Sequence, residues 1–153
     1  MATAKEHLAS WTRKYFENRN LYLHNIRDIK DTEQGLDIIY KDKTVSFFIM
    51  PSLEPETFLS KAQDKKGNYG IACYNTKENL QQLIGSWSVL TAYPSLSVYF
   101  VNPFADGDTR WIIRPKVHDQ VTEKASLKLG LQTLFEGVAE TSLKHVEHMA
   151  AKA

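Results

Sequence analysis

Apolar residues recur at helical spacing near both ends of this chain. Near the start, four side chains with apolar bodies are separated by three or four positions, which places them on one face of a helix. They are Ala4, Leu8, Trp11 and Tyr15. A second stripe of the same kind begins near Thr122 and runs through Leu127, Leu131, Leu134, Phe135 and Val138. The pattern therefore predicts a helix that ends in the polar run 17–20 and a long helix near the other end of the chain.

The chain between these helices begins with extended segments. Residues 35–40 and 44–50 are rich in β-branched and aromatic side chains and are joined by a short polar turn, a combination typical of a β-hairpin. Pro51 ends the second strand because proline has no N–H to donate to a sheet. Residues 21–29 form a less regular extended segment before the hairpin. We expect a three-strand meander, followed by a short helix that begins at Pro55.

A β-α-β unit comes next. Residues 69–74 and 96–101 are short apolar runs of the kind found in strands that are covered on both faces. Helical spacing links them, and Asn75 followed by Glu78 resembles a helix-capping pair. The two strands should be parallel, with a right-handed crossover between them. Residues 110–114 then return as a further strand.

Together these elements predict an α/β fold, a mixed sheet with an N-terminal helix, a three-strand meander, a β-α-β unit and a C-terminal helix. A chain of 153 residues has the usual length of one domain, and we assign that domain to residues 1–139. Residues 140–153 are helix-prone but carry few apolar side chains, so we expect this tail to fray.

Charge and cysteine content narrow the possible partners and environments. The 19 basic and 18 acidic residues nearly balance, which disfavours a protein that coats nucleic acid but leaves room for a local basic patch. Cys73 is the only cysteine, so no disulfide forms within the chain, and its apolar neighbours indicate a buried thiol. No segment has the length of a membrane span or the pattern of a signal peptide, so we expect a cytoplasmic protein without membrane contact.

One aspartate and the order of the elements carry a resemblance to a known family. The segment Gly35-Leu36-Asp37-Ile38 resembles the second-strand signature of the restriction-endonuclease-like, PD-(D/E)xK superfamily. The order of helices and strands over residues 4–101 is similar to the core of that fold. The resemblance implies that Asp37 binds a divalent cation. In the family, a glutamate or aspartate on the next strand shares the Mg²⁺, and a lysine two residues later positions or polarises the attacking water.

The remaining positions of that motif are not filled here. They fall near Ile49 and Pro51, which can neither bind a metal nor act as the lysine, so a catalytically silent relative without a cofactor is our leading hypothesis. Charged residues of the following helix offer replacements, namely Glu54, Glu56 and Lys61. In the alternative, Asp37 and Glu56 bind Mg²⁺ and Lys61 orients water, as in a Mg²⁺-dependent nuclease with migrated catalytic residues.

Cations gather around the strand at 110–114. Alternation puts Arg110 and Arg114 on one face of that strand, with Ile112 between them. With further lysines and a tryptophan they form a candidate nucleic-acid-binding surface that has stacking capacity. The full set is Arg110, Trp111, Arg114, Lys116, Lys61, Lys65 and Lys66. A solvated sheet edge, protected from aggregation by its charge, is the competing interpretation.

Polar residues also follow the two parallel strands. Asn75 and Thr76 come after one strand, and Asn102 and Asp106 come after the other. Ligands of open α/β sheets bind at the carboxyl ends of such strands, so these four residues form a candidate ligand edge. Helix capping by Asn75 and turn formation at Asn102 are the competing explanation.

Three functions are consistent with these features. The leading hypothesis is a non-catalytic, nuclease-like binding or assembly module that contacts nucleic acid through Arg110, Arg114 and the lysines near Lys61. The second is the Mg²⁺-dependent nuclease. The third is a protein-interaction or homodimerisation domain without a nucleic-acid role, which uses an exposed strand edge or the last helix.

Overall fold

The computed structural model describes residues 3–152, which contain one open sheet of six strands. The strands are β1 (Ile26–Asp31), β2 (Gly35–Tyr40), β3 (Thr44–Ile49), β4 (Tyr69–Tyr74), β5 (Leu96–Val101) and β6 (Arg110–Ile113). The helices are α1 (Ala4–Leu23), α2 (Pro55–Lys61), α3 (Lys77–Gly85), α4 (Trp87–Leu90), α5 (Pro115–Val121), α6 (Lys124–Glu136) and α7 (Leu143–Lys152). The predicted α/β class with a mixed sheet is therefore confirmed.

The strands lie side by side in chain order. The first three, β1, β2 and β3, are antiparallel neighbours. The next pairs, β3 with β4 and β4 with β5, are parallel, and β6 returns antiparallel to β5. The predicted meander, the parallel strands of the β-α-β unit and the returning strand are thus confirmed.

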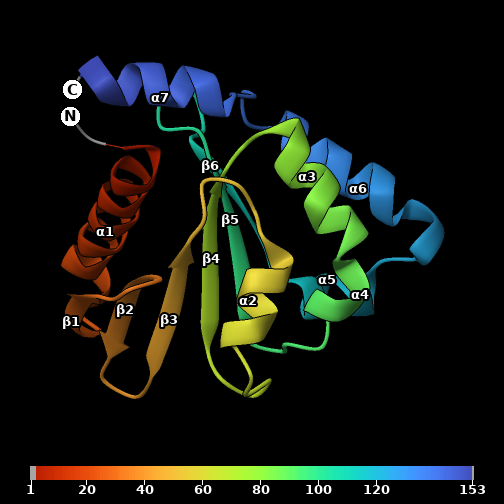
Figure 1. The fold of residues 1–153 in the computed structure, drawn as a ribbon. Helices are drawn as coiled ribbons and strands as arrows, with labels where there is room; N and C mark the ends of the chain where they lie inside the picture. The colour runs from red at the N-terminus through yellow and green to blue at the C-terminus, as the bar shows by residue number, and fades with distance from the viewer. Residues whose placement is uncertain (1–2, 153) are drawn as a thin grey trace.

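Helices cover both sides of the sheet (Figure 1). One side carries α1 and α7, and the other carries α2 to α6. Successive side chains of a strand point alternately to the two sides. In β5, for example, Val98 and Phe100 pack toward α2–α6, whereas Tyr99 and Val101 pack toward α1.

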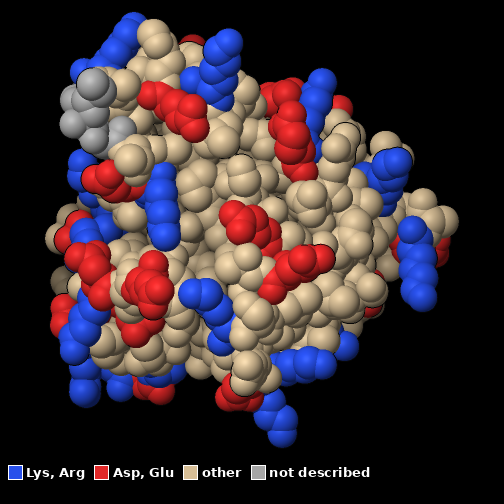
Figure 2. All heavy atoms as spheres, in the orientation of Figure 1, with Lys and Arg blue, Asp and Glu red and all other residues tan. Residues whose placement is uncertain are grey.

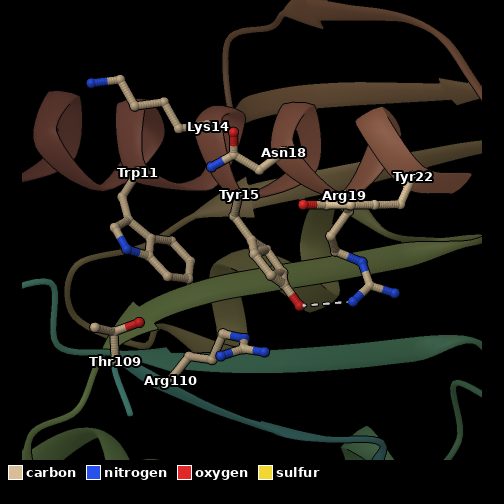
Figure 3. Close-up of a pocket in the computed structure, with 8 residues that line it drawn as sticks. All are labelled: Trp11, Lys14, Tyr15, Asn18, Arg19, Tyr22, Thr109 and Arg110. Atoms are coloured by element: carbon tan, nitrogen blue, oxygen red, sulfur yellow. Dashed lines mark hydrogen bonds between the residues drawn. The ribbon is translucent and has the colours of Figure 1, made fainter. Parts of the chain in front are cut away.

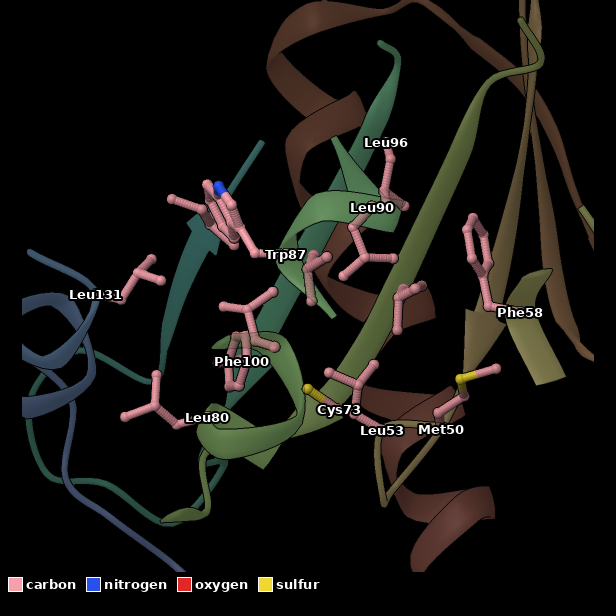
Figure 4. Packing of buried hydrophobic residues seen from close by; sticks show 14 of the residues in the cluster. Met50, Leu53, Phe58, Cys73, Leu80, Trp87, Leu90, Leu96, Phe100 and Leu131 are labelled. Atoms are coloured by element: carbon pink, nitrogen blue, oxygen red, sulfur yellow. The ribbon is translucent and has the colours of Figure 1, made fainter. Parts of the chain in front are cut away.

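The larger core lies between the sheet and helices α2–α6 (Figure 4). Cys73 of β4 points into it and is fully buried, which confirms the predicted buried thiol and raises the pKa of that thiol. Phe100 of β5 and Trp111 of β6 stack in the same core, with their ring centroids 4.2 Å apart.

A smaller core joins α1 to the other side of the sheet. Phe16 packs edge-on against Phe47 of β3, with ring centroids 5.0 Å apart. Phe47 occupies space that Gly70 of β4 leaves free, because a Cβ at that glycine would lie 2.4 Å from the Phe47 ring. The Tyr74 hydroxyl donates a 2.7 Å hydrogen bond to the Ala4 carbonyl oxygen, which fixes the first turn of α1 on β4.

α1 is longer than the sequence pattern indicated. It continues through the polar run 17–20 to Leu23 and ends at His24, whose φ of 50° is left-handed. The strand expected over residues 21–29 therefore begins only at Ile26, whose N–H donates a 2.9 Å bond to the Asn20 side-chain oxygen. This bond holds the turn between α1 and β1. The helix therefore ends at this turn and not in the polar run 17–20.

Three other helix boundaries differ from expectation. The single helix expected after residue 75 is interrupted at Ser86, which gives α3 and α4. Its N-cap is Thr76, whose hydroxyl accepts from the Asn79 N–H at 3.1 Å, and not Asn75. The unexpected helix α5 starts at Pro115, and α6 then begins at Lys124.

The segment expected to fray forms a packed helix over its described part. Val146 and Ala150 of α7 are fully buried, and Val146 lies in one apolar cluster with Ala4 and Leu8 of α1. Few apolar side chains thus pack this segment against α1 and its neighbours, and fraying of the tail stays a prediction. No helix among residues 3–152 combines the length and apolar character needed to cross a membrane.

Candidate functional site

A groove runs along α1 on the side of the sheet that this helix covers only in part. Three adjoining hollows of about 490, 300 and 440 Å³ make it up. Arg19 lines all three hollows, and Phe16, Tyr40, Lys43 and Tyr99 each line two. The hollows therefore adjoin one another, and we call them together the α1 groove. Each has the size of a small-molecule site.

One wall of the α1 groove is a stripe on the helix itself. Trp11, Tyr15 and Arg19 are spaced by four residues and so share one face of α1. Figure 3 shows them projecting from the helix toward Thr109 and Arg110. The sequence pattern assigned Trp11 and Tyr15 to the core stripe, but both are only half-buried and line the groove.

The floor and opposite wall come from β5 and β6. Alternation places Ser97 and Tyr99 of β5 on the α1 side, with Arg110 and Ile112 of β6 beside them. Ile112 is 39% exposed, so α1 leaves this part of the sheet uncovered. Arg114, at the end of β6, lines the hollow that extends past Tyr99.

The groove concentrates positive charge. Its lining includes five cations, Lys14, Arg19, Lys43, Arg110 and Arg114, and a single carboxylate, Asp42. Ion pairs among residues 3–152 are confined to Arg13–Asp31 and Lys77–Glu140, so none of the five cations has a carboxylate within 4.0 Å. Elsewhere, for instance on the face drawn in Figure 2, acidic and basic side chains are interspersed.

Two guanidinium groups of the groove lie near the ring of Tyr15. The Arg110 guanidinium carbon lies 4.9 Å from the centroid of that ring, and the Arg19 guanidinium carbon lies 5.6 Å from it. Arg19 Nη1 also lies 3.5 Å from the Tyr15 hydroxyl oxygen (Figure 3), and Trp11 stacks on the ring with centroids 5.3 Å apart. Arg110 Nε is shielded from solvent and has no hydrogen-bond partner among the described residues.

Two tyrosines of the groove stay protonated at neutral pH. Burial raises the pKa of Tyr99 and of Tyr40 above the ordinary tyrosine value, and the Arg19 guanidinium opposes the shift in both. A neutral phenol keeps its O–H and can donate a hydrogen bond to an anion. The groove therefore offers hydrogen-bond donors and cations with one competing carboxylate.

The nuclease-like aspartate lies on the other side of the sheet. Leu36 and Ile38 face α1, so Asp37 between them points away from it. Its neighbour in the register is Ser46. Two carboxylates that share a metal must lie on one face of the sheet. The second acid and the lysine of the motif would therefore stand at Ser46 and Phe48. Counting along the sequence had placed them near Ile49 and Pro51. Neither residue supplies a carboxylate or an amine.

The replacement residues are not gathered around Asp37. Glu54 and Lys61 line a separate hollow of about 340 Å³ beside the end of β3, together with Glu33. Asp37 and Glu56 are absent from that lining. Within residues 3–152, no group of three or more His, Cys, Asp or Glu side chains is arranged to hold a metal ion.

The candidate basic surface is only partly assembled. Arg110 and Arg114 line the α1 groove, but Lys61, Lys65, Lys66 and Lys116 are not among its lining residues. Trp111 is 6% exposed, and its indole Nε1 donates a 2.7 Å bond to Asn75 Oδ1. Trp111 is thus a core residue that is not accessible to a base.

The sequence analysis did not identify Arg19 and Lys43 as candidate site residues. The four-residue spacing of Trp11, Tyr15 and Arg19 was the pattern that could have indicated Arg19.

The candidate ligand edge is occupied in part by the protein itself. Asn75 Nδ2 donates to the Val138 carbonyl oxygen at 3.0 Å, and Asn102 Nδ2 donates to the Ala139 carbonyl oxygen at 2.9 Å. Thr76 caps α3, whereas Asn102 and Asp106 both line a hollow of about 550 Å³ next to α7. The residues after α6 therefore occupy the edge at Asn75 and leave a hollow beside Asn102 and Asp106.

The side chains of the α1 groove indicate the kind of ligand that it could bind. Unpaired cations suit phosphate groups, and half-exposed aromatic rings suit planar bases. No family model, no curated protein and no solved structure matches this chain. A proposal for its function therefore rests on the residues of the α1 groove.

Proposed function

We propose that this protein is a non-catalytic binding module for single-stranded nucleic acid, and that the strand lies along the α1 groove. The observation that carries the proposal is the groove's set of five cations without carboxylate partners, interleaved with aromatic side chains. The chain as a whole has a net charge of only +1, so this is a local concentration of charge and not a general property of the surface.

The proposed ligand follows from the combination of charge and rings. Cations supply sequence-independent affinity for a phosphate backbone, and aromatic side chains stack against bases that are not paired. Tyr22, at the last turn of α1, is 86% exposed and lines the groove, so its ring is open to a base. In a duplex the faces of the bases are covered by their neighbours, which is why a single strand fits better.

From the nuclease-like resemblance, the proposal keeps nucleic-acid binding and leaves out hydrolysis. An active relative would need a second carboxylate on the Asp37 face of the sheet, and Ser46 and Phe48 stand at those positions. The cations of the groove lie on the opposite side, where a bound strand would not reach Asp37. A binding role without hydrolysis accounts for both features.

Fluorescence anisotropy tests the proposal. Labelled oligonucleotides of one sequence, as single-stranded DNA, single-stranded RNA and duplex DNA, are titrated with the protein at low and at physiological salt. We expect micromolar binding of the single strands at low salt that weakens steeply as salt rises. Arg114→Ala and Lys43→Ala should each weaken it several-fold. Lys128→Ala, an exposed lysine of α6 that is outside the groove lining, is the matched control and should bind as the wild type does.

Two results would contradict the proposal. One is the absence of binding to every probe at low salt. The other is equal binding by the groove variants and the control, which would place the interaction elsewhere. If the first result is accompanied by a concentration-dependent mass in light scattering, the third hypothesis, homodimerisation without a nucleic-acid role, takes its place.

A further inference from the structure

We infer that Arg19 and Arg110 together clamp one backbone phosphate of the bound strand, beside the Tyr15 hydroxyl. The inference rests on the proposed function of the α1 groove and assigns a specific task to the part of the groove around Tyr15. The rest of the groove supplies additional cations and rings, but only here do two guanidinium groups lie against the same side chain.

The distances place both arginines around the ring of Tyr15. The two guanidinium carbons lie 4.9 and 5.6 Å from the centroid of the same tyrosine ring, although Arg19 comes from α1 and Arg110 from β6. Arg19 Nη1 is within 3.5 Å of the Tyr15 hydroxyl oxygen, so the hydroxyl and the guanidinium face the same space. Figure 3 shows the Tyr15 hydroxyl pointing toward the Arg19 guanidinium, with the Arg110 guanidinium beneath the ring.

The arrangement leaves two positive charges without a counter-ion. The Tyr15 ring stabilises each guanidinium, but neither arginine has a carboxylate within 4.0 Å among residues 3–152. Arg110 Nε has in addition lost contact with water without gaining a hydrogen-bond acceptor from the described residues. A buried donor without a partner is costly, and a charged one more so. A phosphate between the two arginines would remove both costs.

The chemistry of the donors favours a phosphate diester. Guanidinium groups present planar pairs of N–H donors that match two oxygens of a phosphate. The Tyr15 O–H adds a third donor from the ring that holds both arginines in place. Trp11 stacks on Tyr15 at an interplanar angle of 15°, which restricts movement of the ring that both guanidinium groups contact.

The dependence of affinity on salt tests the clamp. For single strands the slope of log K against log salt changes by about 0.7 for each phosphate that the protein neutralises. If one phosphate is shared, Arg19→Ala and Arg110→Ala should each weaken binding at least several-fold with little change in slope, because the remaining arginine still neutralises that phosphate. The double variant should reduce the magnitude of the slope by about 0.7. Lys128→Ala again serves as the control.

Other outcomes overturn the inference and are distinguishable from failure of the proposed function. If the slope of log K against log salt changes by about 0.7 in each single variant and by about twice that in the double variant, the two arginines neutralise two separate phosphates. A double variant that binds as the wild type does means that the strand lies elsewhere in the groove, while binding itself stands. A wild type that binds no strand overturns both proposals.

A hydroxyl deletion and a competitor complete the test. Tyr15→Phe keeps the ring that both guanidinium groups contact and removes the hydroxyl near Arg19, so circular dichroism and the salt slope should be unchanged while affinity falls a few-fold. Inorganic phosphate, added at constant ionic strength, should displace the strand only at millimolar concentration. Displacement at micromolar concentration would assign the two arginines to a free anion and overturn the clamp on a strand.

Discussion

Replacing Asn75 with alanine should destabilise the whole fold, because this one side chain joins three segments that are far apart in the sequence. Its Oδ1 accepts a 2.7 Å hydrogen bond from Trp111 Nε1 of β6. Its Nδ2 donates to the carbonyl oxygens of Val138 and Ala139 beyond α6, at 3.0 and 3.3 Å. Asn75 is fully buried, so water cannot replace these bonds in the folded variant.

The size of the effect follows from the groups that lose their partners. Alanine leaves the indole N–H of Trp111 without an acceptor and takes a donor away from the Val138 carbonyl oxygen. A buried polar group left unpaired costs about 1–3 kcal/mol, so with two such groups the free energy of unfolding should fall by about 2–6 kcal/mol. In a domain of this length that corresponds to a fall in Tm on the order of 10 °C.

A double-mutant cycle isolates the bond between Asn75 and Trp111. Trp111→Phe removes the indole N–H but keeps an aromatic ring against Phe100. In that background Asn75→Ala should cost about 1–3 kcal/mol less than in the wild type, because the donor that it would strand is already gone. Urea unfolding followed by far-UV circular dichroism gives the four free energies, with the exposed Gln120→Ala as a control that should change stability by no more than about 0.5 kcal/mol.

The reasoning would be refuted by either of two results. The first is a loss below about 1 kcal/mol for Asn75→Ala, which would mean that the site relaxes or admits water. The second is an equal loss with and without the indole N–H, which would mean that the 2.7 Å bond contributes nothing beyond packing.

Three further expectations concern pH, α7 and the aspartate of β2. Stability should decline as pH rises above about 9, because burial raises the pKa of Cys73, Tyr74 and Tyr99 above the ordinary values of 9.0 and 10.0, so that only the unfolded chain releases these protons. A urea midpoint that stays constant up to pH 11 contradicts this. Val146→Ala should lower the free energy of unfolding by about 2 kcal/mol in urea titrations, and no change would mean that α7 is not docked on α1. Asp37→Ala should leave single-strand affinity unchanged in anisotropy titrations, whereas Mg²⁺-dependent cleavage that this variant abolishes would favour the nuclease alternative.

The strands were predictable because their signals are local. The hairpin of β2 and β3 follows from composition and a short turn, and β4 and β5 follow from apolar runs whose helical connection makes them parallel. The end of α1 was not predictable in the same way. It depends on a bond between Asn20 and Ile26 that forms only once β1 is in place, and a polar run without it looks like the end of a helix.

The candidate site was harder to predict, because half-buried and buried side chains produce the same pattern in a sequence. Trp11 and Tyr15 continue the apolar stripe of Leu8, yet they pass beyond the edge of the core and line the groove. Trp111 shows the opposite error. A tryptophan between cations on a late strand suggests stacking with a base, but the alternation of side chains along β6 points it into the core. Arg19 became a candidate only when the structure brought α1 and β6 together.

The order of the strands in the sheet has a consequence for synthesis on the ribosome. Each strand pairs with the one made immediately before it, so the sheet can grow strand by strand while the chain is still being extended. The exception is α7, which packs against α1, a helix made before any strand. Until α7 emerges, the apolar side of α1 around Ala4 and Leu8 lacks part of its cover. The nascent chain therefore exposes part of the apolar surface of α1, and translation of α7 is the step that covers it.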